Sequence, residues 1–313
     1  MRALCGPCRR SEQYLGPGAL CSGYSCAVWS ASAQNGGALV SEGSHVAGRE
    51  QLPDIDTTVP HTARVWNYWL GGKDNYPVDE EAGDRISAVM PGIVDTARAV
   101  RSFLVRAVRY LVGEVGIRQL LDVGTGLPTV DNTHQVAQAT APECRIVYAD
   151  NDPLVLAHAR ALLTSTSEGV TDYIDADLRY PDKIVREAAR TLDFTQPIAL
   201  MLLGILNHIM DTDESYAIVN RLLDAVPSGS YLVMSHFTSL IDTEVVEEGM
   251  RIYNDSGGVP PVRGRSRQEL ISYFDRLELL EPGLVSVSRW RPDSSNVGTP
   301  AEVYEFCGVG RKP

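Results

Sequence analysis

The stretch LLDVGTGLPT, residues 120–129, decides the class of fold. A short apolar run of strand type leads to Asp122, and Gly124 and Gly126 follow at once. Glycines in a turn between a strand and a helix let a ligand approach the backbone closely. We therefore predict a strand, a ligand-binding turn and a helix, which together open a nucleotide-binding α/β sheet.

Further strand-like runs follow, separated by helical stretches. They are RIVYAD at 145–150, VTDYIDADL at 170–178, PIALMLLGIL at 197–206 and GSYLVMSHF at 229–237. Strands that alternate with helices at this spacing predict a parallel sheet with right-handed crossovers. Near the end, only a short loop separates GLVSVSRW at 283–290 from EVYEFCGVGRK at 302–312, which predicts a terminal antiparallel pair.

The region upstream of the first strand is helical in pattern. Apolar residues at helical spacing predict helices over about 62–70, 78–90 and 93–113, with Gly71 as the stop of the first. Nothing here can complete a parallel sheet, so we expect the segment to pack against the sheet or across its ligand edge. Downstream, Ser266 and Glu269 form a capping-box pattern at a helix start.

The bulk composition is that of a globular protein. The chain has 313 residues, of which 44% are hydrophobic and 22% charged, with a net charge of −12 and a pI of about 5.0. Such a surface repels a phosphate backbone, so nucleic acid is disfavoured as a partner. No apolar run reaches the roughly 18 residues that a membrane span needs. We expect a cytoplasmic protein with neither a nucleic-acid nor a membrane partner.

Two kinds of cysteine are present. Cys144 and Cys307 occur singly in the body of the chain, where we expect buried, reduced thiols. Four more crowd the start with spacings that resemble a zinc site: Cys5, Cys8, Cys21 and Cys26. Residues 1–50 lack the apolar periodicity of a core around a metal, and a signal peptide fits them poorly. We therefore expect a disordered leader without a metal, and a start at Val40 would leave most of it untranslated.

Two residues after the glycine turn bear on the ligand. The third position of G-x-G-x-x-G is Thr129, so the dinucleotide fingerprint is incomplete. Asp131 lies in or just before the first turn of the next helix, where it would repel a pyrophosphate. S-adenosylmethionine (SAM) has no phosphate and carries a positive sulfonium, so it tolerates both Asp122 and Asp131.

Acidic residues also end the next two predicted strands. Asp150 is placed to bind ribose hydroxyls, while Asn151 or Asp152 could cap the following helix. Asp177 is at a position suited to an adenine amino group, and turn chemistry before Arg179 is the alternative explanation.

The order of these motifs resembles the class I SAM-dependent methyltransferases. The stretches ARVWNYWLGGKDNYPVD, DVGTGLPTVDNTHQVA and VYEFCGVGRK are similar, more narrowly, to an actinobacterial SAM methyltransferase-like family of unassigned substrate. The resemblance runs from about residue 60 to the C-terminus. It implies a Rossmann-like α/β sheet of seven strands, mostly parallel with a terminal antiparallel strand, and SAM over its carboxyl edge. It divides the chain into a leader (1–50), a helical lid region (51–115) and a SAM-binding domain (116–313).

The resemblance also implies which residues contact SAM. The glycine turn would lie along the methionine portion, Asp150 on the ribose, and Asp177 with Leu178 at the adenine. The complete predicted set is Asp122, Gly124, Thr125, Gly126, Asp150, Asn151, Asp177, Leu178 and Asn207.

Two histidines are candidate general bases. Many O-methyltransferases carry an LHDW-like motif after the fourth strand, but here Asn207 occupies the histidine position and His208 follows it. His236, at the end of the fifth predicted strand, is the second candidate. Each could instead be a hydrogen-bonded structural residue.

The stretch NYWLGGKDNYPVD, residues 67–79, contributes a predicted lid. We expect Trp66, Tyr68 and Trp69 to anchor it, although a helix that packs for stability alone is the alternative. The residues predicted at the cavity mouth are Arg64, Tyr68, Gly71, Gly72, Lys73, Asp74, Asn75 and Tyr76.

The sequence thus predicts a SAM-dependent methyltransferase acting on a small, neutral or cationic acceptor. A non-catalytic SAM sensor is the alternative outside catalysis. A nicotinamide-dependent oxidoreductase is the second enzyme class, opposed by Thr129 and Asp131.

Overall fold

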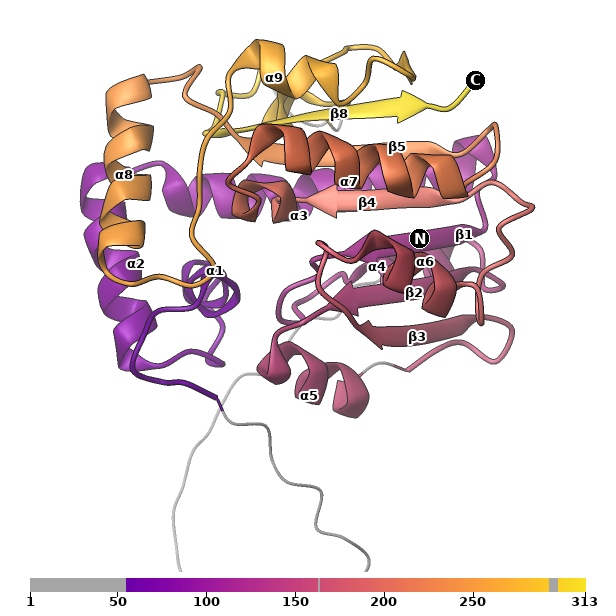
Figure 1. The fold of residues 1–313 in the computed structure, drawn as a ribbon, viewed down its shortest axis with the longest axis horizontal. Coiled ribbons are helices and arrows are strands. Elements are labelled where there is room, and N and C mark those ends of the chain that lie inside the picture. Colours follow the sequence, from indigo (N-terminus) through magenta and orange to yellow (C-terminus); the bar gives the residue numbers. More distant parts are fainter. Residues whose placement is uncertain (1–54, 163, 293–297) are drawn as a thin grey trace, which may run out of the picture. The chain divides into compact units, whose positions relative to one another are not determined.

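The computed structural model describes residues 55–162, 164–292 and 298–313, and a mixed β-sheet runs through its centre (Figure 1). The parallel strands are β1 (Gln119–Val123), β2 (Arg145–Asp150), β3 (Val170–Asp175), β4 (Ala199–Leu203) and β5 (Tyr231–Phe237). β8 (Glu305–Arg311) pairs antiparallel with β5, and the strand order is β3-β2-β1-β4-β5-β8-β6. The predicted α/β class and the terminal antiparallel strand are confirmed.

The end of the sheet differs from the prediction. Instead of one strand over 283–290, two short strands, β6 (Glu278–Leu279) and β7 (Val285–Ser286), each pair with β8. The described sheet therefore has eight strands, not seven. Pro282 and Gly283 lie between the two short strands; proline has no N–H for the ladder, and Gly283 has a φ of 82° that leaves the strand path.

Each face of the sheet has its own core, because successive residues of a strand point to opposite faces. Leu120, Ile146 and Met201 pack toward α3 (Ile93–Arg109) and α4 (Thr133–Thr140). Leu121, Val147 and Leu200 belong to the core that includes α6 (Pro181–Ala188), α7 (Thr212–Ala225) and α9 (Arg267–Ser272). α5 (Pro153–Leu162) follows β2. The predicted capping box of Ser266 and Glu269 is present at the start of α9.

A third core joins the N-terminal helices to a later one. α1 (Thr62–Trp69), α2 (Pro77–Val89) and α8 (Thr243–Asp255) share it with the first turns of α3, through side chains such as Val65, Ile86 and Val246. In Figure 1 these helices lie beyond the arrowheads of the parallel strands, at the carboxyl edge of the sheet. The N-terminal helical segment therefore takes both of the placements that were left open: α3 packs against the sheet, and α1 and α2 lie at its carboxyl edge.

A buried ion pair fixes α1 to α2. Arg64 Nε lies 3.0 Å from Asp79 Oδ2, and both side chains are almost fully buried. The two guanidinium Nη groups donate to the carbonyls of Asp56 and Val59, while Asp79 accepts from the backbone N–H of His61 and of Tyr76. Since each of its three guanidinium nitrogens donates to a neighbouring acceptor and the side chain is buried, Arg64 is a structural clamp.

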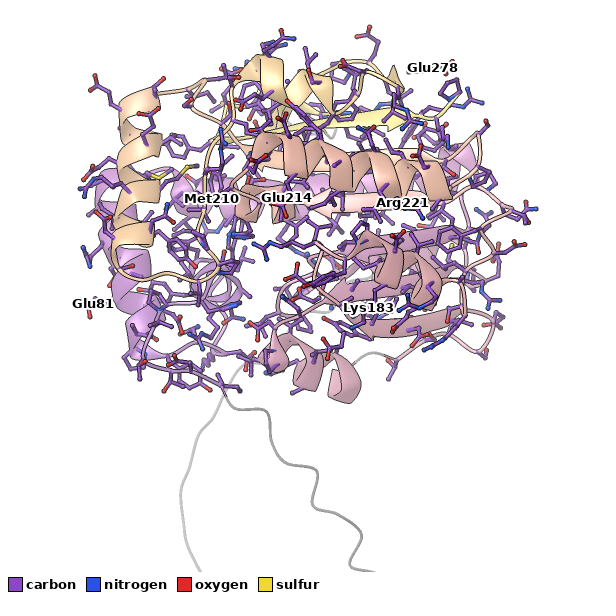
Figure 2. All side chains as sticks on the ribbon, viewed as in Figure 1. Glu81, Lys183, Met210, Glu214, Arg221 and Glu278 are labelled. Carbon is purple, nitrogen blue, oxygen red and sulfur yellow. The ribbon has the colours of Figure 1, made fainter. Side chains whose placement is uncertain are left out.

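Charged side chains cover the outside of the helices. Figure 2 shows Glu81 on α2 and Arg221 on α7 extending away from the ribbon, and both are exposed. Within the described ranges, no helix combines the length and the apolar character that crossing a membrane would require.

Candidate SAM and acceptor site

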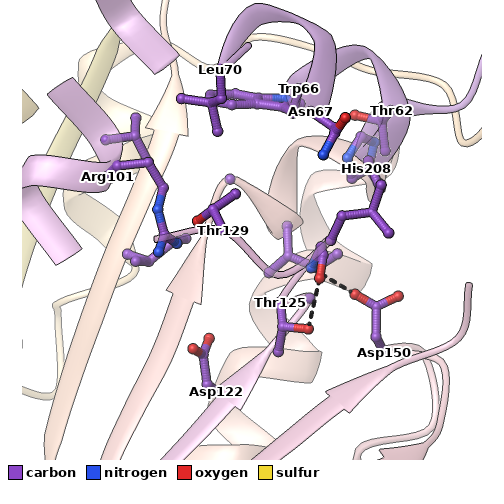
Figure 3. Close-up of a pocket in the computed structure, with 18 of the residues that line it drawn as sticks. Thr62, Trp66, Asn67, Leu70, Arg101, Asp122, Thr125, Thr129, Asp150 and His208 are labelled. Atoms are coloured by element: carbon purple, nitrogen blue, oxygen red, sulfur yellow. Dashed lines mark hydrogen bonds between the residues drawn. The ribbon is translucent and has the colours of Figure 1, made fainter. Parts of the chain in front are cut away.

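A cavity lies at the carboxyl ends of β1, β2 and β4, under α1 and beside α3 (Figure 3). It holds about 990 Å³ of space, counting the part that opens to solvent. The edge of the sheet and the N-terminal helices thus enclose one site.

The glycine loop after β1 forms the floor of this cavity. Gly124 has a φ of 75°, and a Cβ there would lie 2.3 Å from Ile205 Cγ1, so only glycine fits. Gly126 has a φ of 64°, and its N–H donates to Asp150 Oδ2 at 2.9 Å. The other oxygen of Asp150 accepts from the N–H groups of Asn151 and Asp152. Asp150 is therefore held at the cavity wall, as Figure 3 shows.

Two oppositely charged side chains line the inner part of the cavity. Asp122 is buried and accepts a 2.6 Å hydrogen bond from Thr133 Oγ1; burial raises its pKa to about 6, against the opposing effects of Thr133 and Arg101. Arg101, on α3, donates through Nη2 to the carbonyls of Val130 and Asp131. Its Nε is buried without a hydrogen-bond partner, and burial lowers the pKa of its guanidinium.

Arg101 was not predicted from the sequence. It lies in the helix predicted over 93–113, among several arginines, and nothing in the pattern distinguishes the one that faces the cavity. Its nearness to Asp122 depends on how α3 crosses the sheet, which the sequence does not state.

Three predicted SAM contacts do not line the cavity. Asn207 is buried, and its Oδ1 accepts from the N–H of Phe237, so it ties the end of β4 to β5. The side chain of Leu178 belongs to the core below the sheet. Asp177 accepts a 3.2 Å hydrogen bond from Asn151 Nδ2, which places it just behind this cavity-lining residue. Of the other predicted contacts, Asp122, Gly124, Thr125, Gly126, Asp150 and Asn151 all line the cavity.

The two candidate histidines have different environments. His208 lines the cavity; its Nδ1 lies 3.0 Å from the carbonyl of Pro261, so Nδ1 carries the hydrogen and Nε2 keeps its lone pair. Burial lowers the pKa of His208 to about 4, so the ring is neutral near pH 7.

His236 is fully buried and does not line the cavity. Its Nδ1 donates to the carbonyl of Phe237, and its Nε2 accepts from Arg265 Nη1 at 2.6 Å. Both ring nitrogens are occupied, and burial lowers the pKa of His236 to about 3. The prediction of His236 as a general base is therefore wrong, and this histidine is structural.

The predicted cavity mouth is also corrected. Arg64 is the buried clamp, and Tyr68 donates to Asp84 at 2.7 Å on α2. Neither the turn of Gly71 and Gly72 nor residues 73–76 line the cavity, because the turn leads the chain away toward α2. Instead, α1 itself covers the site with Thr62, Ala63, Trp66, Asn67 and Leu70.

The turn supports this cover indirectly. Asn67 Oδ1 accepts from the N–H of Asp74 at 3.0 Å and from Asn75 Nδ2 at 2.9 Å, so the turn fixes the asparagine that faces the cavity. The predicted anchoring by tryptophan is observed: the Trp66 ring packs edge-on against Trp69 and lies 6.0 Å from the ring of Phe237.

Two histidine–aspartate pairs join this segment to β2 and α5. His61 Nδ1 lies 2.9 Å from Asp152 Oδ2, and His158 Nε2 lies 3.5 Å from Asp74 Oδ1. Both pairs link the N-terminal helical segment to the chain just after Asp150. The cover and the floor of the cavity are thus connected on this side.

A carboxyl group that the sequence reasoning missed completes the wall. Glu305, at the start of β8, lines the cavity and is fully buried, and neither carboxyl oxygen has a hydrogen-bond partner. Burial raises its pKa to about 7, against a smaller opposing effect of Ser235. An acid within the apolar strand EFCGVG was the available signal. No group of His, Cys, Asp or Glu in the described ranges is arranged to hold a metal ion, and Cys5, Cys8, Cys21 and Cys26 lie outside them.

Known proteins are similar to this chain in sequence and in structure. Residues 48–313 match a family described as S-adenosyl methyltransferase. A DUF574 family protein from Streptomyces avermitilis is 44% identical, with a TM-score of 0.79 over 82% of this chain and 99% of its own. A putative methyltransferase from Thermobifida fusca is 38% identical, with a TM-score of 0.74 over 82% of this chain and 96% of its own. No match to the curated proteins was found.

Proposed function

The chain belongs to the S-adenosyl methyltransferase family, and we propose that it transfers the methyl group of SAM to a small-molecule acceptor bound in the same cavity. SAM is the cofactor that this family uses. The observation that carries the proposal is the arrangement of Asp150, the glycine loop and the pair Asp122 and Arg101 along one cavity. No observation favours a nicotinamide cofactor.

The nucleoside end of SAM fits the β2 side of the cavity. Asp150 Oδ1 accepts two backbone hydrogen bonds and Oδ2 accepts one, so Oδ2 retains capacity to accept from a ribose hydroxyl. Asn151 lines the cavity next to it, and Asp177 with the backbone at Leu178 lies on the same side for the adenine.

The amino-acid end of SAM fits the inner part. It carries a carboxylate and an ammonium, and the cavity offers one cation and one acid there. The unpartnered Nε of Arg101 would donate to the carboxylate, and Asp122 would attract the ammonium. Gly124 and Gly126 let the chain of the methionine portion approach the backbone.

The protein's contribution to the reaction is positioning. SAM supplies a methyl group that is already activated on a sulfonium, so no protein nucleophile is needed. Trp66, Asn67 and Leu70 of α1 cover the cavity and exclude water. Holding the reactants in line can supply roughly 7–11 kcal/mol of the barrier. Neutral His208, with its Nε2 lone pair, can accept a hydrogen bond from the acceptor and orient it.

Calorimetry with SAM, S-adenosylhomocysteine and NAD tests the assignment. We expect both adenosyl ligands to bind and NAD to show no binding. Arg101→Gln should weaken SAM binding by roughly ten-fold or more, because it removes a charged partner. Arg98→Gln is the matched control, since Arg98 is exposed on the same helix and pairs only with exposed Asp95. Binding of NAD in preference to SAM would refute the proposal.

An acceptor screen with labelled SAM then tests the chemistry. We expect transfer of label to a small molecule. Tight SAM binding without methylation of any acceptor would favour a SAM sensor over an enzyme.

A further inference from the structure

Glu305 lines the cavity from β8, on the other side of β4 and β5 from Asp150. In the sheet it is opposite Phe237 of β5, and Oε1 would lie 3.6 Å from a Cβ placed on Gly204 at the end of β4. The glycine loop and Asp150 follow β1 and end β2, so β4 and β5 lie between them and Glu305 of β8 in the strand order. Leu203, Gly204 and Ile205 line the cavity around this carboxyl group.

This carboxyl group is unusual because it lacks a partner. In the described residues, neither oxygen of this fully buried side chain accepts a hydrogen bond; the neighbouring Ser235 hydroxyl is neutral, and no cation acts on the carboxyl group. A buried carboxyl group without donors is unfavourable, and its ionised form is much more unfavourable than its neutral form. The other buried acid of the cavity, Asp122, differs because it accepts from Thr133 and lies near Arg101. Of these two acids, only Glu305 lacks both a formed hydrogen bond and a nearby cation.

We propose that the methyl acceptor is a small amine, and that Glu305 binds its ammonium group and takes a proton from it. This inference rests on the proposed methyltransferase function. An ammonium supplies both the N–H donors and the positive charge that the buried carboxyl group lacks. Anionic acceptors would be repelled, and a neutral alcohol would supply a donor but no charge.

The proposed step balances as follows. The acceptor ammonium gives one proton to the Glu305 carboxylate, which leaves a nitrogen lone pair. The lone pair forms the N–C bond while the methyl C–S bond breaks, and the bonding electrons remain on sulfur as a neutral thioether. The product is a methylated ammonium, and Glu305 then releases its proton to solvent. An alkyl ammonium, with a pKa of about 10.4, is a far stronger acid than an alcohol, so proton transfer to a carboxylate costs much less from an ammonium than from an alcohol.

His208 complements this arrangement. Its neutral ring can accept a second N–H of the same amine through Nε2, because Nδ1 is occupied by the Pro261 carbonyl. Glu305 and His208 both line the cavity, so an amine has one charged and one neutral acceptor.

Glu305→Gln tests the proposal, with Glu302→Gln as the matched control. Glu302 lies three residues away, is partly exposed and pairs with Arg289 at 2.7 Å. The probes are butylamine, benzylamine and phenethylamine, together with the three alcohols of the same shape. Calorimetry measures their binding with and without S-adenosylhomocysteine. We expect an amine to bind the parent and Glu302→Gln at least ten-fold more tightly than it binds Glu305→Gln, and the alcohols to bind all three proteins equally weakly.

Infrared difference spectroscopy gives a readout that does not depend on turnover. Adding the amine at pH 6 should remove a protonated-carboxyl band in the parent and in Glu302→Gln, and no such band should change in Glu305→Gln. Mass spectrometry after incubation with SAM should then show the methylated amine and no methylated alcohol.

The outcomes separate this inference from the function on which it rests. Failure of SAM and S-adenosylhomocysteine to bind would refute the proposed function. If they bind, equal amine affinity in the parent and Glu305→Gln overturns the amine assignment. Two other outcomes also overturn it: methylation of an alcohol probe but of no amine probe, and failure of all three amines to bind.

Discussion

The backbone N–H of Gly126 donates a 2.9 Å hydrogen bond to Asp150 Oδ2, which fastens the loop after β1 to the end of β2. Two more backbone N–H groups, from Asn151 and Asp152, hold the other oxygen. The carboxylate is therefore fixed before any ligand binds. A site whose first contact is held in this way needs little rearrangement on binding.

Asp150→Ala should lower SAM affinity by roughly one to two orders of magnitude. The variant loses a charged acceptor for the ribose hydroxyls, and a hydrogen bond to a charged group contributes about 1.5–3 kcal/mol. Calorimetry measures the change. Asp175→Ala is the control, because Asp175 is the exposed register partner of Asp150 at the end of β3. SAM binding of parental strength in a folded Asp150→Ala variant would show that the ribose lies elsewhere.

Gly72→Ala and Gly71→Ala should have different effects. A Cβ on Gly72 would lie 2.3 Å from Asn67 Nδ2, so Asn67 must leave its place in the cavity wall. A Cβ on Gly71 meets nothing within 4 Å, and its φ of 78° costs only about 1–2 kcal/mol of stability. We expect Gly72→Ala to weaken SAM binding several-fold and Gly71→Ala to leave it unchanged, as measured by calorimetry beside thermal unfolding.

Equal SAM affinity in the two variants would contradict this view of the turn and show that Asn67 contributes only to packing. Deletion of residues 1–50, nearly all of which precede the family match over 48–313, should leave SAM affinity unchanged. Loss of binding would show that this segment contributes to the site.

The sequence predicted the residues whose position follows directly from strand ends. Gly124, Gly126 and Asp150 each come immediately after an apolar run, and parallel strands bring their ends to one edge. The helices over 62–70 and 78–90 were also predictable, because their apolar spacing spans several turns. The segments β6 and β7 were not, since two-residue strands carry no periodicity.

The sequence could not supply contacts made between distant segments. His236 appeared catalytic because it ends a strand, but Arg265, 29 residues later, occupies its Nε2. Arg64 was predicted at the cavity mouth, but its side chain is buried in an ion pair with Asp79 of α2. Arg101 and Glu305 enter the cavity through the crossing of α3 and the return of β8, which depend on tertiary packing.

His208→Ala should impair catalysis and not SAM binding. If His208 orients the acceptor through Nε2, its loss should lower turnover by about 10²-fold, with SAM affinity within a few-fold of the parent. Single-turnover assays with the identified acceptor measure this, and intact mass should show no covalent methyl-enzyme. If His208→Ala turns over at the parental rate, the rest of the cavity wall, and not His208, orients the acceptor.

His236→Ala should impair the fold instead. The substitution removes the acceptor of Arg265 Nη1 from a fully buried position, which costs about 1–3 kcal/mol of stability. Urea unfolding measures the loss. A variant as stable as the parent, with reduced turnover, would restore His236 as a catalytic candidate.

Glu305→Gln should stabilise the ligand-free protein at alkaline pH. The carboxyl pKa rises from 4.5 to about 7 on folding, so between these values the unfolded chain has lost a proton that the native state keeps. The free energy of unfolding therefore falls as pH rises through this window, by about 1.4 kcal/mol per pH unit, and the full loss of about 3 kcal/mol is present above pH 7. Glutamine cannot ionise and does not incur this loss.

The difference in unfolding free energy between Glu305→Gln and the parent isolates this effect. Asp122, with its pKa raised to about 6, also lowers the parent's stability as pH rises, whereas His208 and His236, with lowered pKa values, lower the parent's stability as pH falls below about 6.5. These contributions are common to both proteins and cancel in the difference. We expect the difference to grow in favour of the variant by about 3 kcal/mol between pH 4.5 and pH 8, measured by urea unfolding, while Glu302→Gln shows no such trend. A difference independent of pH would mean that Glu305 ionises as freely in the native state as in the unfolded chain, and the buried, unpartnered carboxyl group would then have no need of an amine.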